Sequence, residues 1–397
     1  MTSILMQSIN MNTLWITAEE ALALLGTKPQ TLYANVSRGR IRAKADSSDP
    51  RRSLYQLSDV KRLAERNAGR RQSAAVAAET IRWGDPILPT TISTIADGKL
   101  FYRGVDAVEL SRHATLEEAA ALLWNTASVR ISAGGENEPE ASRMGSAFMR
   151  LAARSATDLP ALGRNASVLR VEAADVLSAL AEALAPWPEQ LPLHDRLALG
   201  WQRPQAAELI RKALVLAAEH ELNVSAFAAR VTASSGAALS AAVLAGLTAL
   251  SGPRHGGAWV SISLLAEQAA SVGAREAIRS ALSSEGLVRA FGHRLYPQGD
   301  PRAKALMADL DAPELYANLA EAGEEMLGEP VNIDFALAAL AAKFRLPEDA
   351  PLVIFALAHA VGWLAHALEQ VESGHLIRPR ARYTGPAIGS RSYGLGE

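Results

Sequence analysis

Alanine-rich segments with a 3.6-residue apolar period constrain the fold of this 397-residue chain most strongly. This period places apolar side chains on one face of a helix, and alanine has the highest intrinsic helix propensity. Strand patterns are short, and the clearest is a hairpin over 91–102 that turns at Ala96-Asp97-Gly98. We therefore expect a mainly α fold with a small β-hairpin. The predicted helical segments are 116–124, 171–184, 205–222, 336–342 and 352–371.

The chain carries no charged residue between Arg230 and Arg254. The strongly apolar part of this stretch is shorter than the roughly 18 residues that a membrane span needs, so we interpret it as a buried helix. The N-terminus lacks a basic segment ahead of an apolar core, so we expect no secretory signal. The absence of cysteine excludes thiolate catalysis and fits a reducing compartment. These features predict a cytoplasmic protein that does not contact a membrane.

Charge divides the chain into two parts. Residues 14–72 hold 12 Lys/Arg and 6 Asp/Glu, a net charge of +6, whereas residues 73–397 hold 28 and 36, a net charge of −8. Capping and turn residues in 14–72 predict a helix, a second helix, a hairpin and a third helix, with a linker at 73–84. This order and the segment "DPRRSLYQLSDVKRL" resemble the winged helix-turn-helix of the excisionase/MerR type.

That resemblance implies DNA binding, with the second helix in the major groove and hairpin arginines on phosphates. The alternative is a small protein-binding or scaffold domain whose charges are solvated. The residues expected to contact nucleic acid are Lys28, Arg38, Arg40, Arg51 and Arg52.

Five polar segments interrupt the apolar body, and they combine histidines, arginines and an aspartate. Arginine binds carboxylates through paired N–H groups, so the arginines indicate a small anionic substrate. An aspartate together with glycine-flanked histidines is suited to removing a proton next to a carbonyl. Taken singly, His220 could be a solvated charge pair and His255 a structural cap. Likewise, Asp334 could be a helix N-cap and Arg378 an ordinary surface residue.

In their order along the chain, these segments resemble the citrate synthase family. The likeness covers 85–394 and includes an N-terminal segment, "TISTIADGKLFYRGVDAVELSRHATLEEAAALLW". It continues through "EHELNVSAFAARVTAS", "GPRHGGA", "FGHRLYPQGDPRA", "NIDF" and "IRPRARYTGP". The resemblance implies a two-domain helical fold that closes over substrate. The large domain would comprise 85–256 and 341–397, and the small domain 257–340.

The resemblance also implies an acyltransferase of the tricarboxylic acid cycle that condenses acetyl-CoA with oxaloacetate to citrate and CoA. Asp334 would be the base that deprotonates the acyl-CoA methyl group. Neutral His255 would donate a hydrogen bond to the enolate oxygen, and His293 would polarise the keto carbonyl. Acyl-CoA is then a substrate, and neither a metal nor a further cofactor is expected. The expected substrate-binding residues are His220, Arg302, His359 and Arg378, the last reaching a neighbouring site in a homodimer.

The chain departs from the family pattern at several positions. His359 occupies the arginine position of the motif S-R-x-x-G-W, and Pro297 stands where a basic residue commonly faces the CoA phosphates. Glu219 replaces an aspartate, and Trp259 an asparagine. Because histidine lacks the permanent fork of arginine, we expect weaker binding of oxaloacetate or a different 2-oxo acid. The alternatives are a 2-methylcitrate synthase that uses propionyl-CoA, and a nucleic-acid-binding regulator whose synthase-like body senses metabolites.

Overall fold

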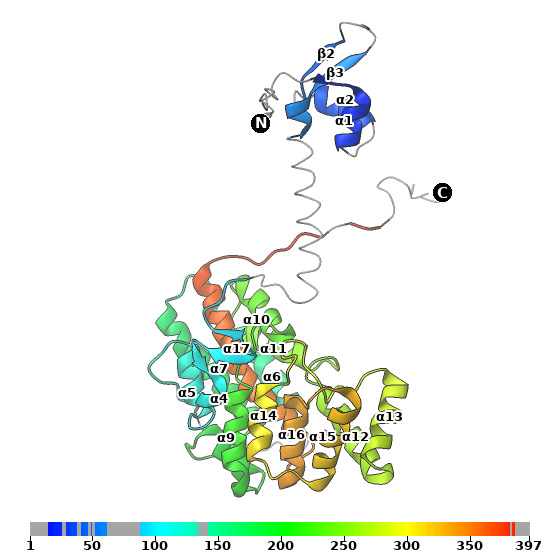
Figure 1. Ribbon diagram of the computed structural model, residues 1–397. Helices are drawn as coiled ribbons and strands as arrows, with labels where there is room; N and C mark the ends of the chain where they lie inside the picture. Colours follow the sequence, from blue (N-terminus) through cyan, green and yellow to red (C-terminus); the bar gives the residue numbers. More distant parts are fainter. Residues whose placement is uncertain are drawn as a thin grey trace, which may run out of the picture. The chain divides into compact units, whose positions relative to one another are not determined.

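The chain forms two compact units, Met1–Pro89 and Thr90–Glu397 (Figure 1). The computed structural model describes residues 15–25, 29–37, 41–46, 49, 52–61, 88–132, 134, 142–381 and 383–385. The linker predicted at 73–84 lies outside these residues.

Within its described residues, the N-terminal unit contains two short helices, a further helical segment at 57–61 and a three-stranded antiparallel sheet in the order β1-β3-β2. A reciprocal cap begins the first helix, because Thr17 Oγ1 accepts from the Glu20 N–H while Glu20 Oε2 accepts from the Thr17 N–H. In the sheet, Lys44 lies opposite Leu54. The elements are β1 (Trp15–Ile16), α1 (Ala18–Leu25), α2 (Pro29–Ser37), β2 (Ala43–Ala45) and β3 (Ser53–Gln56).

A small apolar core of its own holds this unit together. Helical residues 57–61 follow β3, and Leu57 and Val60 from this segment pack with Leu32 of α2 and Ile16 of β1. Asp59 fixes the entry to the hairpin, because it accepts the Arg42 backbone N–H at 3.1 Å and Arg42 Nε at 2.8 Å. The described elements therefore follow the order of two helices, a hairpin and a third helix that the sequence predicted.

The C-terminal unit begins with the predicted hairpin, extended by a third strand in the order β4-β5-β6. Ser93 lies opposite Tyr102, and Asp97 and Gly98 form the turn with φ of 50° and 72°. Two consecutive positive φ values match the twist of antiparallel strands. The strands are β4 (Ser93–Ala96), β5 (Lys99–Tyr102) and β6 (Val105–Asp106).

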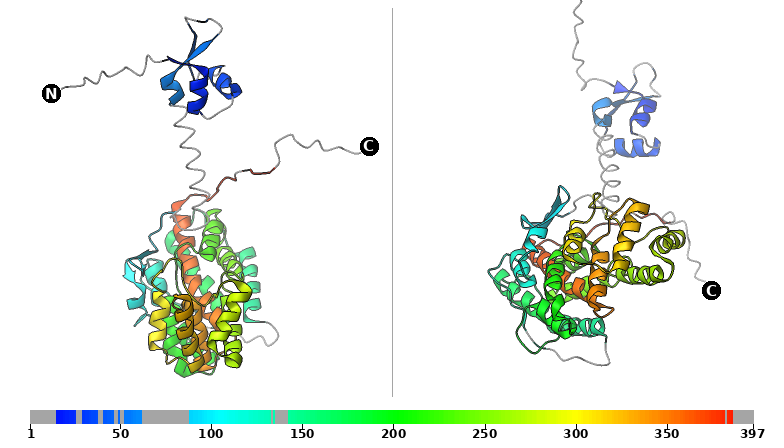
Figure 2. Two further views of the ribbon diagram at one scale, coloured as in Figure 1. Left: turned by 45° about the vertical axis from the view of Figure 1, so that its right-hand side comes forward. Right: turned by 60° about the horizontal axis from the view of Figure 1, so that its bottom comes forward.

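Helices form the rest of this unit, as predicted (Figure 2). The first group comprises α4 (Ala107–Leu110), α5 (Leu116–Leu123), α6 (Arg143–Thr157), α7 (Ala166–Leu184), α8 (Leu193–Gly200), the 3₁₀ turn η2 (Pro204–Ala206), α9 (Ala207–Leu216), α10 (Val224–Ser234) and α11 (Leu239–Leu250). The second comprises α12 (Ala258–Val272), α13 (Ala274–Glu285), α14 (Pro301–Asp309), α15 (Glu314–Leu327), α16 (Ile333–Phe344) and α17 (Ala350–Ser373).

Helix α17 is the centre of the core and packs against α7, α9, α10 and α11 (Figure 1). Its length and composition would suffice for a membrane span, but 89% of its most apolar window is buried within the protein. Helix α11 approaches it closely, because a Cβ at Gly246 would lie 2.6 Å from the Trp363 ring. The uncharged stretch after Arg230 contributes the end of α10 and all of α11, so its interpretation as a buried helix is confirmed.

The helix predicted over 205–222 is wrong at its C-terminal end. Helix α9 stops at Leu216, and His220 lies in a non-helical segment. One hydrogen bond and one backbone angle explain the break. The Gly362 N–H donates to Ala218 O at 3.0 Å, and Glu221 has a left-handed φ of 52°. Asn223 then caps α10, so the short segment 217–223 is held against α17.

Candidate active site

His220 lies in this segment, with its ring buried among other polar rings. Its Nε2 lies 3.0 Å from the Tyr296 hydroxyl, and the His293 ring meets it edge-on at a centroid distance of 5.0 Å. Burial and the charge of Arg302 hold the pKa of His220 well below its usual value. His220 is therefore neutral near pH 7 and is not a solvated ion pair with its neighbouring glutamates.

A buried chain of hydrogen bonds through Glu219, His366 and Arg230, here called the relay, anchors the residue that precedes His220. Glu219 Oε1 lies 2.9 Å from His366 Nε2, and both side chains are fully buried. Arg230 donates to His366 Nδ1 at 3.2 Å, which leaves the His366 proton on Nε2 to bond Glu219. Burial opposes ionisation of Glu219, but the hydrogen bond from His366 keeps the Glu219 pKa lowered. The relay therefore fixes the backbone that carries His220.

Arg302 is the cation of the site and forms a buried pair with Asp300. Its Nε and Nη2 donate to the two Asp300 oxygens at 2.9 and 2.8 Å. Asp300 also caps α14 and accepts the Ile333 N–H at 3.1 Å, which joins the starts of α14 and α16. Burial and the Arg302 charge lower the pKa of His293 to about 4. Because His293 Nδ1 accepts the Leu295 N–H at 3.2 Å, the proton of the neutral ring lies on Nε2.

Asp334 lies in the first turn of α16 but does not cap it. Asn332 is the cap, with its Oδ1 accepting the Phe335 N–H at 3.3 Å. Burial raises the pKa of Asp334 to about 6, although the charge of Arg302 opposes the shift. A carboxylate with a raised pKa is a stronger base than an ordinary aspartate. Asp334 is therefore suited to accept a proton near neutral pH.

His255 lies in a tight turn before α12. A Cβ at Gly256 would clash with the carbonyl oxygen of Leu250, so this turn requires glycine. His255 Nε2 lies 2.8 Å from Ser225 Oγ, and burial lowers the His255 pKa, so the ring is neutral. Ser225 also donates to Asn223 Oδ1 at 2.9 Å. A hydroxyl has one proton, so His255 donates from Nε2 in this arrangement.

The expected donation from neutral His255 to an enolate oxygen requires the other tautomer. Turning the Ser225 hydroxyl from Asn223 to His255 Nε2 would place the His255 proton on Nδ1. The role of His255 thus depends on a hydroxyl that the sequence did not single out.

Most of the predicted body residues form one cluster. The His220 ring contacts the His293 ring and the Tyr296 hydroxyl, and the charge of Arg302 acts on His220, His293, His359 and Asp334. Arg378 is exposed beyond the end of α17. Within the described ranges, no three His, Asp or Glu side chains are grouped so that they could hold a metal ion. Sequence reasoning missed Asn223, Ser225, Tyr296, Trp363 and His366, of which only Asn223 had a local signal, as a helix cap.

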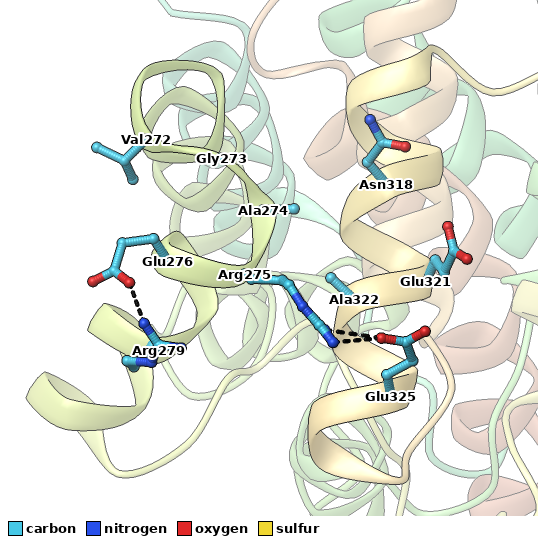
Figure 3. A pocket seen from close by; sticks show the side chains of 10 residues that line it. All are labelled: Val272, Gly273, Ala274, Arg275, Glu276, Arg279, Asn318, Glu321, Ala322 and Glu325. Atoms are coloured by element: carbon cyan, nitrogen blue, oxygen red, sulfur yellow. Dashed lines mark hydrogen bonds and ion pairs between the residues drawn. The ribbon is translucent and has the colours of Figure 1, made fainter.

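One groove lies away from this cluster, between the start of α13 and α15 (Figure 3). It has a volume of about 510 Å³. Four of the five charged residues that line it form pairs, Arg275 with Glu325 at 2.7 Å and Arg279 with Glu276, and Glu321 is the fifth (Figure 3). The groove therefore does not compete with the histidine cluster as a candidate active site.

Of the residues expected to contact nucleic acid, the structure describes Arg52. It is exposed and lies 3.4 Å from Asp49. Lys28, Arg38, Arg40 and Arg51 lie outside the described residues.

Comparisons with known proteins agree with this fold. The family model for the C-terminal domain of citrate synthase matches residues 129–380, so the chain belongs to the citrate synthase family. It is 37% identical over 194 residues to citrate synthase 2 of Bacillus subtilis, and the matched region covers 46% of this chain and 52% of the relative. It is 35% identical over 186 residues to 2-methylcitrate synthase 2 of Corynebacterium glutamicum, and this match covers 44% of this chain and 48% of the relative. The chain thus spans about half the length of the curated relatives it matches.

Solved structures extend the likeness in fold. Citrate synthase from Pyrobaculum aerophilum matches with a TM-score of 0.63 and 27% identity, over 76% of this chain and 91% of that one. Citrate synthase from Thermotoga maritima matches with a TM-score of 0.62 and 24% identity, over 78% and 98%. The mainly helical citrate synthase fold predicted for the body is therefore confirmed.

Proposed function

We propose that this chain catalyses a citrate synthase-type condensation of an acyl-CoA with a 2-oxo acid. The observation that carries the proposal is the cluster itself, in which Asp334 has a raised pKa and shares Arg302 with neutral His220 and His293. Asp334 takes a proton from the carbon next to the thioester. The resulting enolate forms a carbon–carbon bond to the keto carbon, whose oxygen accepts from His293 Nε2. Water then cleaves the thioester and releases CoA.

The finer assignments belong to the same proposal. Acetyl-CoA with oxaloacetate is the reaction that gives the family its name, and propionyl-CoA would make the enzyme a 2-methylcitrate synthase. Arg378 would complete the site of a second copy in a homodimer, and the large and small domains would be 85–256 with 341–397, and 257–340. A cytoplasmic location, with acyl-CoA as substrate and no further cofactor, completes the proposal.

The test is release of free CoA thiol from acetyl-CoA or propionyl-CoA, each with oxaloacetate or 2-oxobutyrate. The chain has no cysteine, so the protein adds no thiol signal of its own. We expect turnover that requires both an acyl-CoA and a 2-oxo acid, and the faster acyl donor distinguishes the two synthases. Thiol release that ignores the 2-oxo acid, or none in any combination, would contradict the proposal.

The rate should depend on pH through Asp334. The base acts only when it is ionised, and its pKa is raised to about 6. We expect kcat/KM to be level above about pH 7 and to fall about tenfold per pH unit below pH 6. Chromatographic measurement of CoA between pH 4.5 and 8 would show this limb. A limb at the ordinary aspartate value near 4 would contradict the assignment.

As a second function, we propose that the N-terminal unit is a winged helix-turn-helix that binds nucleic acid. Supporting this, exposed Lys44 and Arg52 lie on or beside the β2–β3 hairpin, Tyr33 of α2 is exposed, and the segment carries a charge of +6. We expect the full chain to bind a labelled random-sequence duplex in anisotropy titrations, more weakly at 200 than at 50 mM salt. The double variant Lys44→Ala, Arg52→Ala should weaken binding. No binding at 50 mM salt would favour a protein-binding or scaffold role.

A further inference from the structure

Tyr296 lies in the short segment of the chain that also carries His293 and Arg302. Its backbone N–H donates to the His293 carbonyl oxygen at 2.9 Å, and its own carbonyl oxygen accepts the Gly299 N–H at 2.9 Å. Two consecutive turns therefore hold the Tyr296 backbone between these residues. The position of the Tyr296 ring is thereby tied to the cluster on both sides.

The Tyr296 ring lies among three polar side chains of the cluster. Its hydroxyl lies 3.0 Å from His220 Nε2. The His293 ring lies against it at a centroid distance of 4.9 Å, and the Arg302 guanidinium lies 5.8 Å from its centroid. A guanidinium at this distance from an aromatic face is attracted by the electrons of the ring. Tyr296 is only 2% exposed, so its hydroxyl depends on partners within the protein.

The Tyr296 hydroxyl donates its proton to His220. Among the described residues, His220 Nε2 is the one hydrogen-bond partner of this hydroxyl. If the hydroxyl accepted from Nε2 instead, its own proton would be buried without an acceptor, which is unfavourable. Burial raises the pKa of the Tyr296 phenol, so the group keeps its proton at neutral pH. Because His220 is neutral, its Nε2 accepts and its ring proton lies on Nδ1.

Nδ1 of His220 is therefore an N–H donor that the protein does not use. It has no hydrogen-bond partner in the part of the chain that the structure describes. His359 differs, because its Nδ1 donates to Ala217 O at 2.8 Å and its Nε2 accepts from the Asn223 amide. His293 resembles His220, because the proton of its neutral ring lies on a nitrogen that the Leu295 N–H does not contact. His220 and His293 can thus donate to oxygens of a ligand.

We propose that Tyr296 is a positioning residue for the 2-oxo acid, because its hydroxyl holds the His220 ring and keeps the ring proton on Nδ1, available to an oxygen of the acid. This inference rests on the proposed function, which supplies the ligand. Arg302 and, from a second copy, Arg378 remain the cations for the carboxylates. Phenylalanine at this position would keep the ring beside His293 but would release the His220 ring and its proton.

The test measures binding of oxaloacetate by isothermal titration calorimetry without acyl-CoA, so that it does not depend on turnover. In Tyr296→Phe, we expect the Kd to rise about tenfold, because one orienting hydrogen bond is lost. In a His220→Ala background, the same change should raise the Kd less than about twofold, because Tyr296 acts through His220. The matched control is Tyr316→Phe. It removes the hydroxyl of another buried tyrosine, whose ring packs on Phe335, and should bind as the wild type does.

A second measurement follows the proton itself. Nuclear magnetic resonance of protein with ¹⁵N-labelled histidine rings distinguishes the two neutral tautomers, and the His220 signals are those that His220→Ala lacks. In the wild type at pH 7, we expect the His220 proton on Nδ1. In Tyr296→Phe, we expect a mixture of the two tautomers, whereas Tyr316→Phe should match the wild type.

Each outcome decides the matter. An unchanged Kd in folded Tyr296→Phe, or a wild-type His220 proton on Nε2, would overturn the inference and leave the condensation intact. Oxaloacetate binding without thiol release would overturn the proposed function, while the Kd ratio and the tautomer still decide the inference. A wild type that does not bind oxaloacetate would overturn the inference. If circular dichroism shows that Tyr296→Phe is unfolded, the wild-type tautomer decides alone.

Discussion

Replacing Asp334 with asparagine should lower kcat for thiol release by about a thousandfold, within the range of about 10²–10⁴ typical of removing a general base. The asparagine side chain has nearly the same shape but cannot accept a proton from a carbon acid. The helix cap should survive, because Asn332 provides it and Asp334 does not. The variant should therefore fold, and KM for the acyl-CoA should change much less than kcat.

The matched control is Asp311→Asn. Asp311 is an exposed aspartate that pairs with Lys343 on the surface, away from the histidine cluster. We expect its kcat to equal the wild-type value within a factor of two. Unimpaired turnover by Asp334→Asn, in a preparation free of wild-type enzyme, would remove Asp334 from the mechanism.

Replacing Trp363 with alanine should destabilise the C-terminal unit by about 3–5 kcal/mol, the usual cost of deleting a large buried aromatic side chain. Trp363 is fully buried in α17, and its ring fills the space opposite Gly246 of α11. Its indole N–H also donates to Ser225 at 3.0 Å, so the Ser225 hydroxyl would lose one of its partners. Urea unfolding followed by far-ultraviolet circular dichroism would show a lower midpoint with an unchanged slope.

The control for this prediction is Leu264→Ala, which removes a large side chain that is 59% exposed. Surface substitutions of this kind usually change the free energy of unfolding by less than about 0.5 kcal/mol. A loss below about 1 kcal/mol for Trp363→Ala would mean that α11 and α17 do not depend on this contact as the structure indicates.

The sequence predicted the fold well where signals are local. Apolar periodicity located α5, α7, α16 and α17, and the Asp97-Gly98 turn located the β4–β5 hairpin. The end of α9 could not be predicted, because Gly362 breaks the helical pattern from 144 positions away by bonding Ala218. Periodicity in one segment contains no information about such a partner.

In the candidate site, too, local sequence signals were sufficient for some features, whereas others depend on residues far away in the chain. Residue type and order were enough to select His220, His293, Arg302 and Asp334, which the structure gathers in one cluster. The state of His359 was beyond the sequence, because it depends on Asn223 and on the carbonyl of Ala217, both more than 130 positions away. A motif shows whether arginine or histidine stands at a position. Only the three-dimensional structure shows whether a ring nitrogen of that histidine already has a hydrogen-bond partner.

Formation of a new carbon–carbon bond is the central claim, and mass spectrometry of the product tests it most directly. The enzyme would be incubated with acetyl-CoA labelled with ¹³C at both acetyl carbons, together with 2-oxobutyrate or oxaloacetate. The account predicts a condensed acid that contains both labelled carbons, with CoA released in equal amount. Labelled acetate as the sole product would identify a thioesterase and contradict the account.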